Sequence, residues 1–319
     1  MEEVTAKTAE EFGFTAKNIK KHKYMYICKG ERETRIIKKT SLDKESIMLV
    51  YEFKKYLFEN GFKNTDKYFL SKSGEPYYCS GESTFIMTEY INAPEASFSD
   101  ADIFLDIVKA VAEFHKAGKG FAANEHRLRE NNISEEMKKG IQSLENIRKS
   151  LRGKKHFKEY DVKFMKNYEM ICAHTKTAYE TAISTDIKDS VSVCHNGLKE
   201  ETISTADKVY ITGMDELSKN GAVVDLADII ERYMRKHDEK YVGIEKILSV
   251  YSEINKLSKN DERMLYAMLL FPKGYIKASK AMYAKKRNWV PIGAERKFSR
   301  MAELQAENER YIRPIRCER

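Results

Sequence analysis

The chain has 319 residues, of which 42% are hydrophobic and 33% are charged. This composition is typical of a globular protein and excludes wholesale disorder, and the length suits one large domain or two lobes. Apolar runs are far shorter than a membrane span, and the acidic first residues do not resemble a secretory signal. We therefore expect synthesis in the cytoplasm and no membrane partner.

The net charge is small, because 57 Lys and Arg stand against 49 Asp and Glu, which leaves +8. Basic and acidic residues alternate along most of the chain, which is typical of a solvated surface and makes a nucleic-acid partner the weaker interpretation. An odd number of dispersed cysteines indicates reduced thiols and no disulfide framework or zinc site. These cysteines are Cys28, Cys79, Cys172, Cys194 and Cys317.

The first ninety residues predict a small antiparallel sheet with one inserted helix. Two β-rich runs, 24–29 and 34–39, are separated by Gly30 and predict a hairpin. A helix is expected over 43–59, where apolar residues recur at helical spacing before Asn60 and Gly61. Further strands are expected at 67–70, 77–79 and 84–90.

After Pro94 the pattern changes to helices. Ser99 with Asp102 resembles a capping box at the start of the first helix. Further helices are expected at 161–182, 226–235, 244–254, 262–283 and 294–311. A short β-rich island is expected at 190–194 and 208–212. This order predicts an α+β, two-lobed, protein-kinase-like fold, with a small antiparallel sheet lobe over residues 1–92 and a larger, mostly helical lobe over residues 93–319.

Several short segments resemble the CotS family of spore coat proteins, which are similar to aminoglycoside and choline phosphotransferases. One is the run Val-Asp-Leu-Ala-Asp-Ile-Ile at 224–230, another is Leu-Phe-Pro-Lys at 270–273, and a third is the turn Gly-Glu-Pro-Tyr at 74–77. The resemblance covers roughly residues 15 to 310. It implies a kinase-like fold, synthesis in the mother-cell cytoplasm, a final place in the spore coat and other coat proteins as partners.

The resemblance also implies positions for a nucleotide. Lys38 lies where the family places its phosphate-binding lysine, with Glu45 or Glu52 as an ion-pair partner, although Lys38 could also be an ordinary exposed strand lysine. Residues 88–91 resemble the segment that meets an adenine, so Glu89 and Ile91 are candidate cofactor-binding residues. They could equally be part of the core.

The catalytic positions of the family are degenerate in this chain. Gly197, two residues after His195, stands where the family has its catalytic Asp, and Thr202 stands where it has a metal-binding Asn. Gly213 replaces the first Asp of the metal loop, which leaves Asp215 as the surviving candidate metal ligand. Glycine cannot accept a proton, and threonine is at best a weak metal ligand. We expect His195 to be structural, with a hydrogen bond to backbone near the metal loop.

These substitutions favour a pseudokinase that has no catalytic residues, needs no cofactor and acts as a structural or interaction component in spore coat assembly. Two alternatives stay open. One is a divergent, magnesium-dependent ATP phosphotransferase acting on a small molecule, with Glu200, Glu201 or Asp215 in new roles. The other is a scaffold that binds ATP without turnover.

Overall fold

The computed structural model describes residues 4–122, 128–130, 132–187, 191–236, 242–284 and 293–316. The chain forms two compact units: unit 1 contains residues 1–129 and 192–219, and unit 2 contains residues 130–191 and 220–319. The chain passes between the units within three short strands, β7 (Arg129–Glu130), β8 (Val191–Cys194) and β11 (Ser218–Gly221). The lobes predicted from the sequence, residues 1–92 and 93–319, do not share the boundaries of these two units and stay a prediction.

Unit 1 is built on an antiparallel sheet with the order β1-β2-β3-β6-β4, in which β5 also pairs with β6. The predicted hairpin is confirmed as β2 and β3, with Cys28 opposite Arg35. The first strand was not predicted, because its Lys-rich sequence does not alternate polar and apolar residues. The strands are β1 (Asn18–His22), β2 (Met25–Lys29), β3 (Thr34–Thr40), β4 (Tyr68–Phe69), β5 (Tyr78–Ser80) and β6 (Ser83–Glu89).

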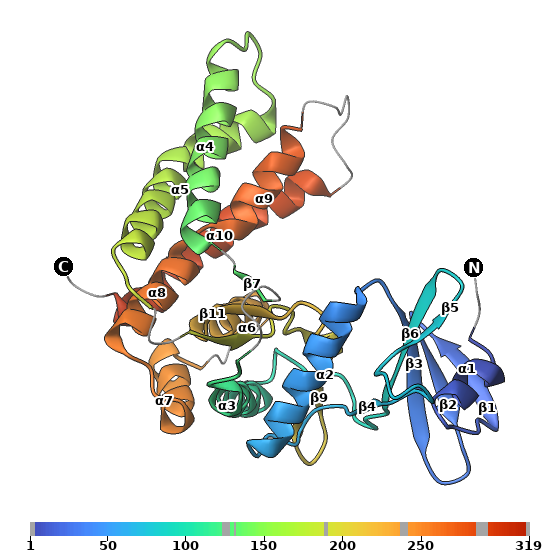
Figure 1. Cartoon of the computed structure of the whole chain (residues 1–319). Coiled ribbons are helices and arrows are strands. Elements are labelled where there is room, and N and C mark those ends of the chain that lie inside the picture. The colour runs from blue at the N-terminus through green and yellow to red at the C-terminus, as the bar shows by residue number, and fades with distance from the viewer. Residues whose placement is uncertain are drawn as a thin grey trace. The chain divides into compact units, whose positions relative to one another are not determined.

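Two helices flank this sheet, α1 (Ala6–Glu11) and α2 (Lys44–Glu59), and Figure 1 shows them on opposite sides of it. The chain around α1 packs Phe12 and Phe14 into a core with Ile37 and Met87 of the sheet. The predicted helix at 43–59 is confirmed as α2. Its N-cap is Asp43, whose carboxylate accepts a hydrogen bond from the Ser46 N–H at 2.7 Å.

The next helix, α3 (Ala101–Gly118), corrects the predicted cap. Asp100, and not Ser99, is the N-cap, because its carboxylate accepts hydrogen bonds from the N–H groups of Asp102 and Ile103 at 2.9 and 3.0 Å. The Ser99 hydroxyl instead pairs with the Ser97 hydroxyl at 2.8 Å.

Residues 192–219 return to unit 1 and carry η2 (Glu200–Thr202), β9 (Ile203–Thr205) and β10 (Val209–Ile211). Backbone hydrogen bonds attach this segment to the earlier chain: the Ala96 N–H donates to Ile203 O at 2.9 Å, and the Ile211 N–H donates to Asn64 O at 2.9 Å. The degenerate loops therefore belong to the same compact unit as the sheet.

Unit 2 is helical. The predicted helix at 262–283 is wrong, because it is two helices: Phe271 ends the first, and Pro272 is the N-cap of the second, where its missing N–H costs no helical hydrogen bond. Among the described residues, no helix is long and apolar enough to cross a membrane. The helices are α4 (Ile133–Arg152), which was not predicted, α5 (Glu159–Ile183), α6 (Val223–Lys236), α7 (Ile244–Ile254), α8 (Lys259–Leu270), α9 (Lys273–Met282), α10 (Ala294–Ile312) and η3 (Arg313–Ile315).

Candidate functional site

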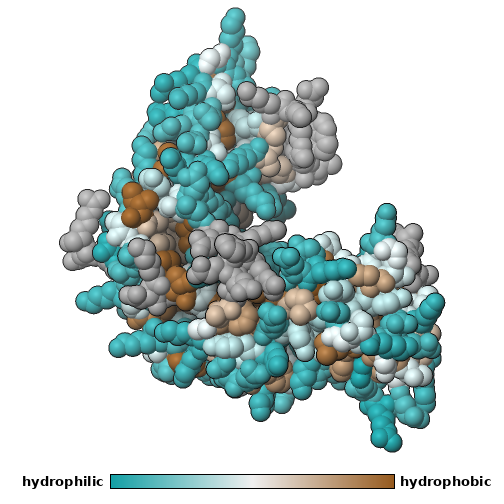
Figure 2. Space-filling model, viewed as in Figure 1, coloured by the Kyte–Doolittle hydropathy of each residue, from teal (hydrophilic) through white to brown (hydrophobic). Residues whose placement is uncertain are grey.

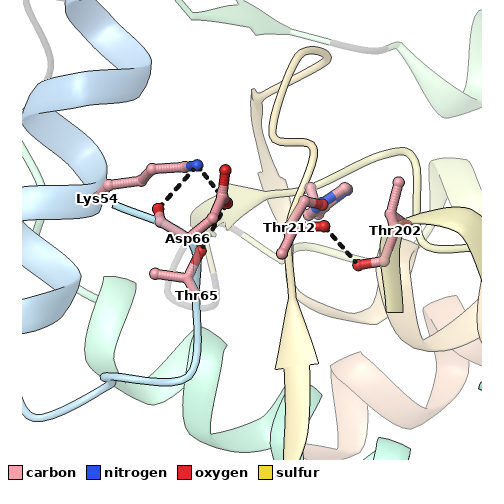
Figure 3. Close-up of polar contacts among 6 residues, drawn as sticks. Lys54, Thr65, Asp66, Thr202 and Thr212 are labelled. Carbon is pink, nitrogen blue, oxygen red and sulfur yellow. Dashed lines mark hydrogen bonds and ion pairs between the residues drawn. The ribbon is translucent and has the colours of Figure 1, made fainter. Parts of the chain in front are cut away.

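The two positions expected to hold a metal, Thr202 and Gly213, pack against each other. Gly213 has φ +71°, and a Cβ added there would lie 3.0 Å from the Thr202 Cγ2 methyl. The Thr212 N–H donates to Thr202 O at 2.8 Å, and the Thr212 hydroxyl donates to the same oxygen at 3.4 Å (Figure 3). These two hydrogen bonds hold the backbone of the two loops side by side. An aspartate at 213 would meet both an unfavourable backbone conformation and this methyl group.

The Thr202 hydroxyl is already used within its own loop. It donates to Gly197 O at 2.8 Å and accepts from the Lys199 N–H at 3.0 Å. The side chain is buried. The proton of the hydroxyl and one of its two lone pairs are therefore engaged within the loop, and the degeneracy of this position stays a prediction.

His195 connects the same two loops and is fully buried. Its Nδ1 accepts a hydrogen bond from the Gly197 N–H at 3.2 Å, so the proton resides on Nε2, which lies 2.9 Å from Thr212 O. The predicted hydrogen bond of His195 to backbone near the metal loop is confirmed, and its structural role stays a prediction. Gly197 has room for a Cβ, at 3.5 Å from the His195 ring, but carries no group that could accept a proton.

Two of the three acidic residues that were considered for new roles in these loops lie on the surface. Asp215 is exposed, and Glu201 on η2 is exposed as well. Mg²⁺ needs oxygen ligands in near-octahedral geometry, usually with one or two carboxylates held toward it. With Gly213 in place of one acid and the Thr202 hydroxyl engaged, the residues at the metal positions do not fit the ion.

Lys38 lies on β3, half-buried, opposite Met25 on one side and Ile86 on the other. Because directly opposed residues and alternate residues of a strand share a face, Thr88 and Lys38 project from the same face of the sheet. The Thr88 hydroxyl is buried and has no hydrogen-bond partner among the described residues. This face thus has a lysine and an unsatisfied hydroxyl, which are groups that a polar ligand could engage.

Helix α2 contributes a buried ion pair that involves neither predicted glutamate, and the pairing of Lys38 with Glu45 or Glu52 stays a prediction. Glu45 and Glu52 are both exposed on α2. The same helix instead contributes Lys54, whose Nζ lies 2.5 Å from Asp66 Oδ1 and 3.1 Å from Asp66 O, with both side chains 5% exposed (Figure 3). The sequence contained a signal for this, because Lys54 lies four residues after the buried Val50, on the apolar stripe of the helix.

Burial and charge set the protonation of this pair. Burial raises the cost of charge on Asp66, yet the ammonium groups of Lys54 and Lys38 hold the pKa of Asp66 below its ordinary value. Burial lowers the pKa of Lys54, and the carboxylate of Asp66 opposes that shift. Burial, together with the Asp66 and Asp215 carboxylates, raises the pKa of Tyr68 well above its ordinary value. Lys38, Lys54, Asp66 and Asp215 therefore form one electrostatic cluster within unit 1.

The candidate cofactor residues of the 88–91 segment lie at the end of β6. Glu89 is opposite Arg35, and its N–H already donates to Lys67 O at 2.9 Å. Ile91 is half-buried in the segment that follows the strand. Because Glu89 is next to Thr88 on β6, its side chain projects from the opposite face of the sheet, and Ile91 lies after the strand. The role of both residues stays a prediction.

Solved structures similar to this chain are small-molecule kinases. An aminoglycoside phosphotransferase from Alicyclobacillus acidocaldarius aligns with a TM-score of 0.82 at 14% identity, over 99% of this chain and 96% of that one. A spectinomycin phosphotransferase solved with ADP and spectinomycin (TM-score 0.64, 12% identity) covers 94% and 96%, and an amicoumacin kinase solved with AMP-PNP and Ca²⁺ (TM-score 0.64, 13% identity) covers 94% and 92%. These similarities confirm the predicted kinase-like fold.

A search of curated proteins finds no significant match. The sequence does match a protein family over residues 6–315, and that family is described as "Spore coat putative kinase YutH". The match confirms the resemblance to spore coat, kinase-like proteins that was inferred from short segments. The chain therefore belongs to the YutH family of kinase-like spore coat proteins.

Proposed function

We propose that this protein is a pseudokinase that acts by binding other proteins during spore coat assembly, without phosphoryl transfer. The observation that carries the proposal is the packing of Thr202 against Gly213, in which a methyl group and a glycine stand at two metal positions. Phosphoryl transfer depends on positioned acids that hold metal ions and orient the acceptor hydroxyl. Neither acid is present at these positions, and the space for one of them is filled.

The first test of this proposal measures the turnover of ATP. Purified protein is assayed for ATP consumption with magnesium, alongside Asp215→Ala, which removes the surviving acid of the metal loop. We expect no turnover above a protein-free control in either sample. Magnesium-dependent turnover that Asp215→Ala abolishes would contradict the proposal and support the divergent phosphotransferase.

The structural role is tested in the spore-forming host. Deletion of the gene is expected to change the protein composition of extracted coats. We expect the intact gene and the Asp215→Ala variant to restore that composition equally, because binding does not require the acid. Restoration by the intact gene alone, with the variant protein present at normal level, would contradict a non-catalytic role.

A nucleotide-binding scaffold is the second candidate, and one feature favours it. Lys38 and the unsatisfied Thr88 hydroxyl share a face of the sheet. The acids of the preceding turn are turned to their own partners: Glu31 lies 3.0 Å from Lys17 and Glu33 lies 2.5 Å from Arg35, both exposed. Because Lys17 and Arg35 lie beside them, Glu31 and Glu33 would repel a nucleotide phosphate less than two unpaired carboxylates would.

Thermal unfolding with ATP, in EDTA, distinguishes the scaffold from a protein without a ligand. A ligand at 100 times its Kd adds about 2.7 kcal/mol, which raises Tm by several degrees. If the scaffold is correct, Lys38→Ala should lose this shift, whereas Lys39→Ala should keep it, because Lys39 is exposed and bonds the Ser83 hydroxyl at 2.8 Å. The absence of any shift in the unmodified protein would eliminate the scaffold.

A further inference from the structure

Two segments, one in each unit, combine a high density of positive charge with an exposed turn. Residues 17–29 contain five lysines, and residues 148–158 contain four lysines and two arginines, and neither segment contains an acid. Removing these eleven cations leaves 46 basic residues against 49 acidic ones, a net charge of −3 for the remainder. A third acid-free stretch, 272–294, also holds six cations, but it lies partly outside the described residues. We refer to 17–29 and 148–158 as the basic segments.

Each basic segment forms the turn of a hairpin. Residues 17–29 include β1, its turn and β2, and residues 148–158 connect α4 to α5. Five consecutive residues, 20–24, are exposed in the first, and eight consecutive residues, 152–159, are exposed in the second. Figure 1 shows the second at the free end of the α4–α5 hairpin, and Figure 2 shows mainly hydrophilic residues there.

An aromatic ring stands among the lysines of each turn. The sequences are Lys-Lys-His-Lys-Tyr at 20–24 and Lys-Lys-His-Phe-Lys at 154–158. Tyr24 is 61% exposed and Phe157 is 49% exposed, which makes them two of the few large apolar side chains that the described residues leave in solvent. The same chemistry thus recurs on two unrelated supports, a β-hairpin and a helical hairpin.

Most of the cations in these segments have no acidic partner within the part of the chain that the structure describes. Lys17 and Lys23 pair with Glu31 and Glu95, and Lys154 and Arg148 pair with Asp161 and Glu169. The exposed side chains without an ion pair are Lys20, Lys21, Lys29, Lys149, Arg152, Lys155 and Lys158.

The turn of the β-hairpin also contains backbone strain. His22 is opposite Met25, so the turn has two residues, and Lys23 holds φ +52° where glycine is favoured. Among the described residues, only Lys23 and Asn196 combine a side chain with such a φ. The ammonium of Lys23 already pairs with Glu95 at 2.8 Å, so this strain is a property of the turn and does not indicate an external partner.

We propose that the two basic segments are docking surfaces for an anionic phospholipid bilayer, with ammonium groups at the lipid phosphates and the rings of Tyr24 and Phe157 at the interface. Lysine suits a diffuse layer of charge, whereas arginine is favoured for fixed bidentate contacts to a carboxylate, and nine of the eleven cations are lysines. Single-stranded nucleic acid is held in grooves, but these surfaces are protruding turns. Aromatic rings beside lysines are typical of membrane-interface binding.

This inference is independent of the proposed pseudokinase function, and it differs from the expectation of no membrane partner. A surface contact needs no spanning helix. It requires only cations and rings that are free to meet the bilayer.

Co-sedimentation with vesicles tests the proposal. The full chain is mixed with vesicles of phosphatidylcholine alone or of phosphatidylcholine with phosphatidylglycerol, at low and at physiological salt. We expect binding to the anionic vesicles, weakening as salt rises, and none to the neutral ones. No binding to anionic vesicles at low salt would overturn the proposal.

Matched variants separate the basic segments from net charge. Lys149→Gln/Arg152→Gln/Lys155→Gln and Lys20→Gln/Lys21→Gln/Lys29→Gln each remove three unpaired cations from one segment. The control, Lys138→Gln/Lys246→Gln/Lys280→Gln, removes three exposed lysines from α4, α7 and α9. We expect a loss of at least about tenfold in partition for each segment variant and less than about twofold for the control. Equal losses in all three would overturn the proposal.

The rings supply a second readout. Phe157→Ser should weaken binding to anionic vesicles by about tenfold, whereas Ile183→Ser, which changes a side chain that is 57% exposed outside the segments, should not. All variants are checked for unchanged thermal unfolding. Binding of the protein to polyglutamate or single-stranded DNA but not to vesicles would show that the partner is another polyanion, and it would overturn the lipid assignment.

Discussion

Helix α2 and the loops around β10, both in unit 1, bury polar groups in different ways. On the helix side, Lys54 and Asp66 form an ion pair at 2.5 Å between two buried side chains. On the loop side, Thr202 and His195 are neutral, and their hydrogen bonds go to backbone groups. The chain thus keeps buried charge beside the sheet but none at the metal positions.

The difference separates a part of the fold whose stability depends on a buried ion pair from a part whose stability does not. A buried ion pair is costly to break, because the remaining partner is left without a counter-charge. A neutral loop closed by hydrogen bonds carries no such penalty and depends on steric fit. The two regions should therefore respond to different perturbations.

The largest effect is expected from breaking the ion pair. Asp66→Asn leaves the Lys54 ammonium buried without a counter-charge and should lower the free energy of unfolding by about 3–5 kcal/mol. Chemical denaturation followed by circular dichroism measures the change. The double variant Lys54→Met/Asp66→Leu should recover most of the loss, because it removes both charges.

An exposed pair provides the control for this prediction. Glu159 lies 2.7 Å from Lys163, and its side chain is 74% exposed. Glu159→Gln should leave stability nearly unchanged, since water solvates both groups. A double variant at the buried pair that is as unstable as Asp66→Asn would show that the site depends on something other than charge.

A smaller effect is expected from the loop side. Gly213→Ala places a Cβ at φ +71° and 3.0 Å from the Thr202 methyl, and it should cost about 1–2 kcal/mol. Thr202→Ser removes that methyl but keeps the hydroxyl, so Gly213→Ala should cost less in that background. A double-mutant cycle by chemical denaturation measures the difference.

Gly197→Ala is the matched substitution, because its Cβ would make only an ordinary contact at 3.5 Å and its φ is not left-handed. It should be tolerated. Costs that are equal at 197 and 213, and independent of Thr202, would mean that the two loops are not sterically coupled.

The sequence predicted the loop side better than the helix side. The backbone hydrogen bond of His195 and the closeness of Gly197 and Thr202 could be expected from their positions along one continuous segment, and a family resemblance supplies that order directly. Lys54 and Asp66 are twelve residues apart and meet only because α2 and the chain after it fold back together. The sequence places Lys54 on the apolar stripe of α2, but it does not show which acid pairs with it.

Element boundaries show the same limit. The helix at 43–59 was predictable because an N-cap residue, an apolar stripe and a glycine agree. The single helix expected at 262–283 failed because helical spacing continues across Pro272, although proline ends the hydrogen-bond ladder there. Where a proline interrupts a stretch with helical periodicity, the proline should therefore set the predicted end of the helix.

The smallest expected effect is a difference in how the stability of the two regions depends on pH. The pKa of Asp66 is held below its ordinary value in the folded state, so its contribution to stability is present above the unfolded pKa and is lost as pH falls through the folded value. Stability should therefore fall below about pH 4 in the unmodified protein, and less steeply in Lys54→Met/Asp66→Leu. The variant Thr202→Ser should keep the full acid dependence, because the loop side is neutral.

The contribution of Glu231 in unit 2 must be separated from this measurement, because it changes with pH in the opposite direction to that of Asp66. Burial and the nearby Asp228 carboxylate raise its pKa from 4.5 to about 7, while its nearest recorded cation, Arg235, lies 3.8 Å away. Its contribution is present below the unfolded pKa and is lost as pH rises toward 7. In a Glu231→Gln background, the gain in stability between pH 7 and 4.5 should shrink, and the loss below pH 4 should remain. An acid loss that persists unchanged when Lys54 and Asp66 are both replaced would show that other carboxylates control it.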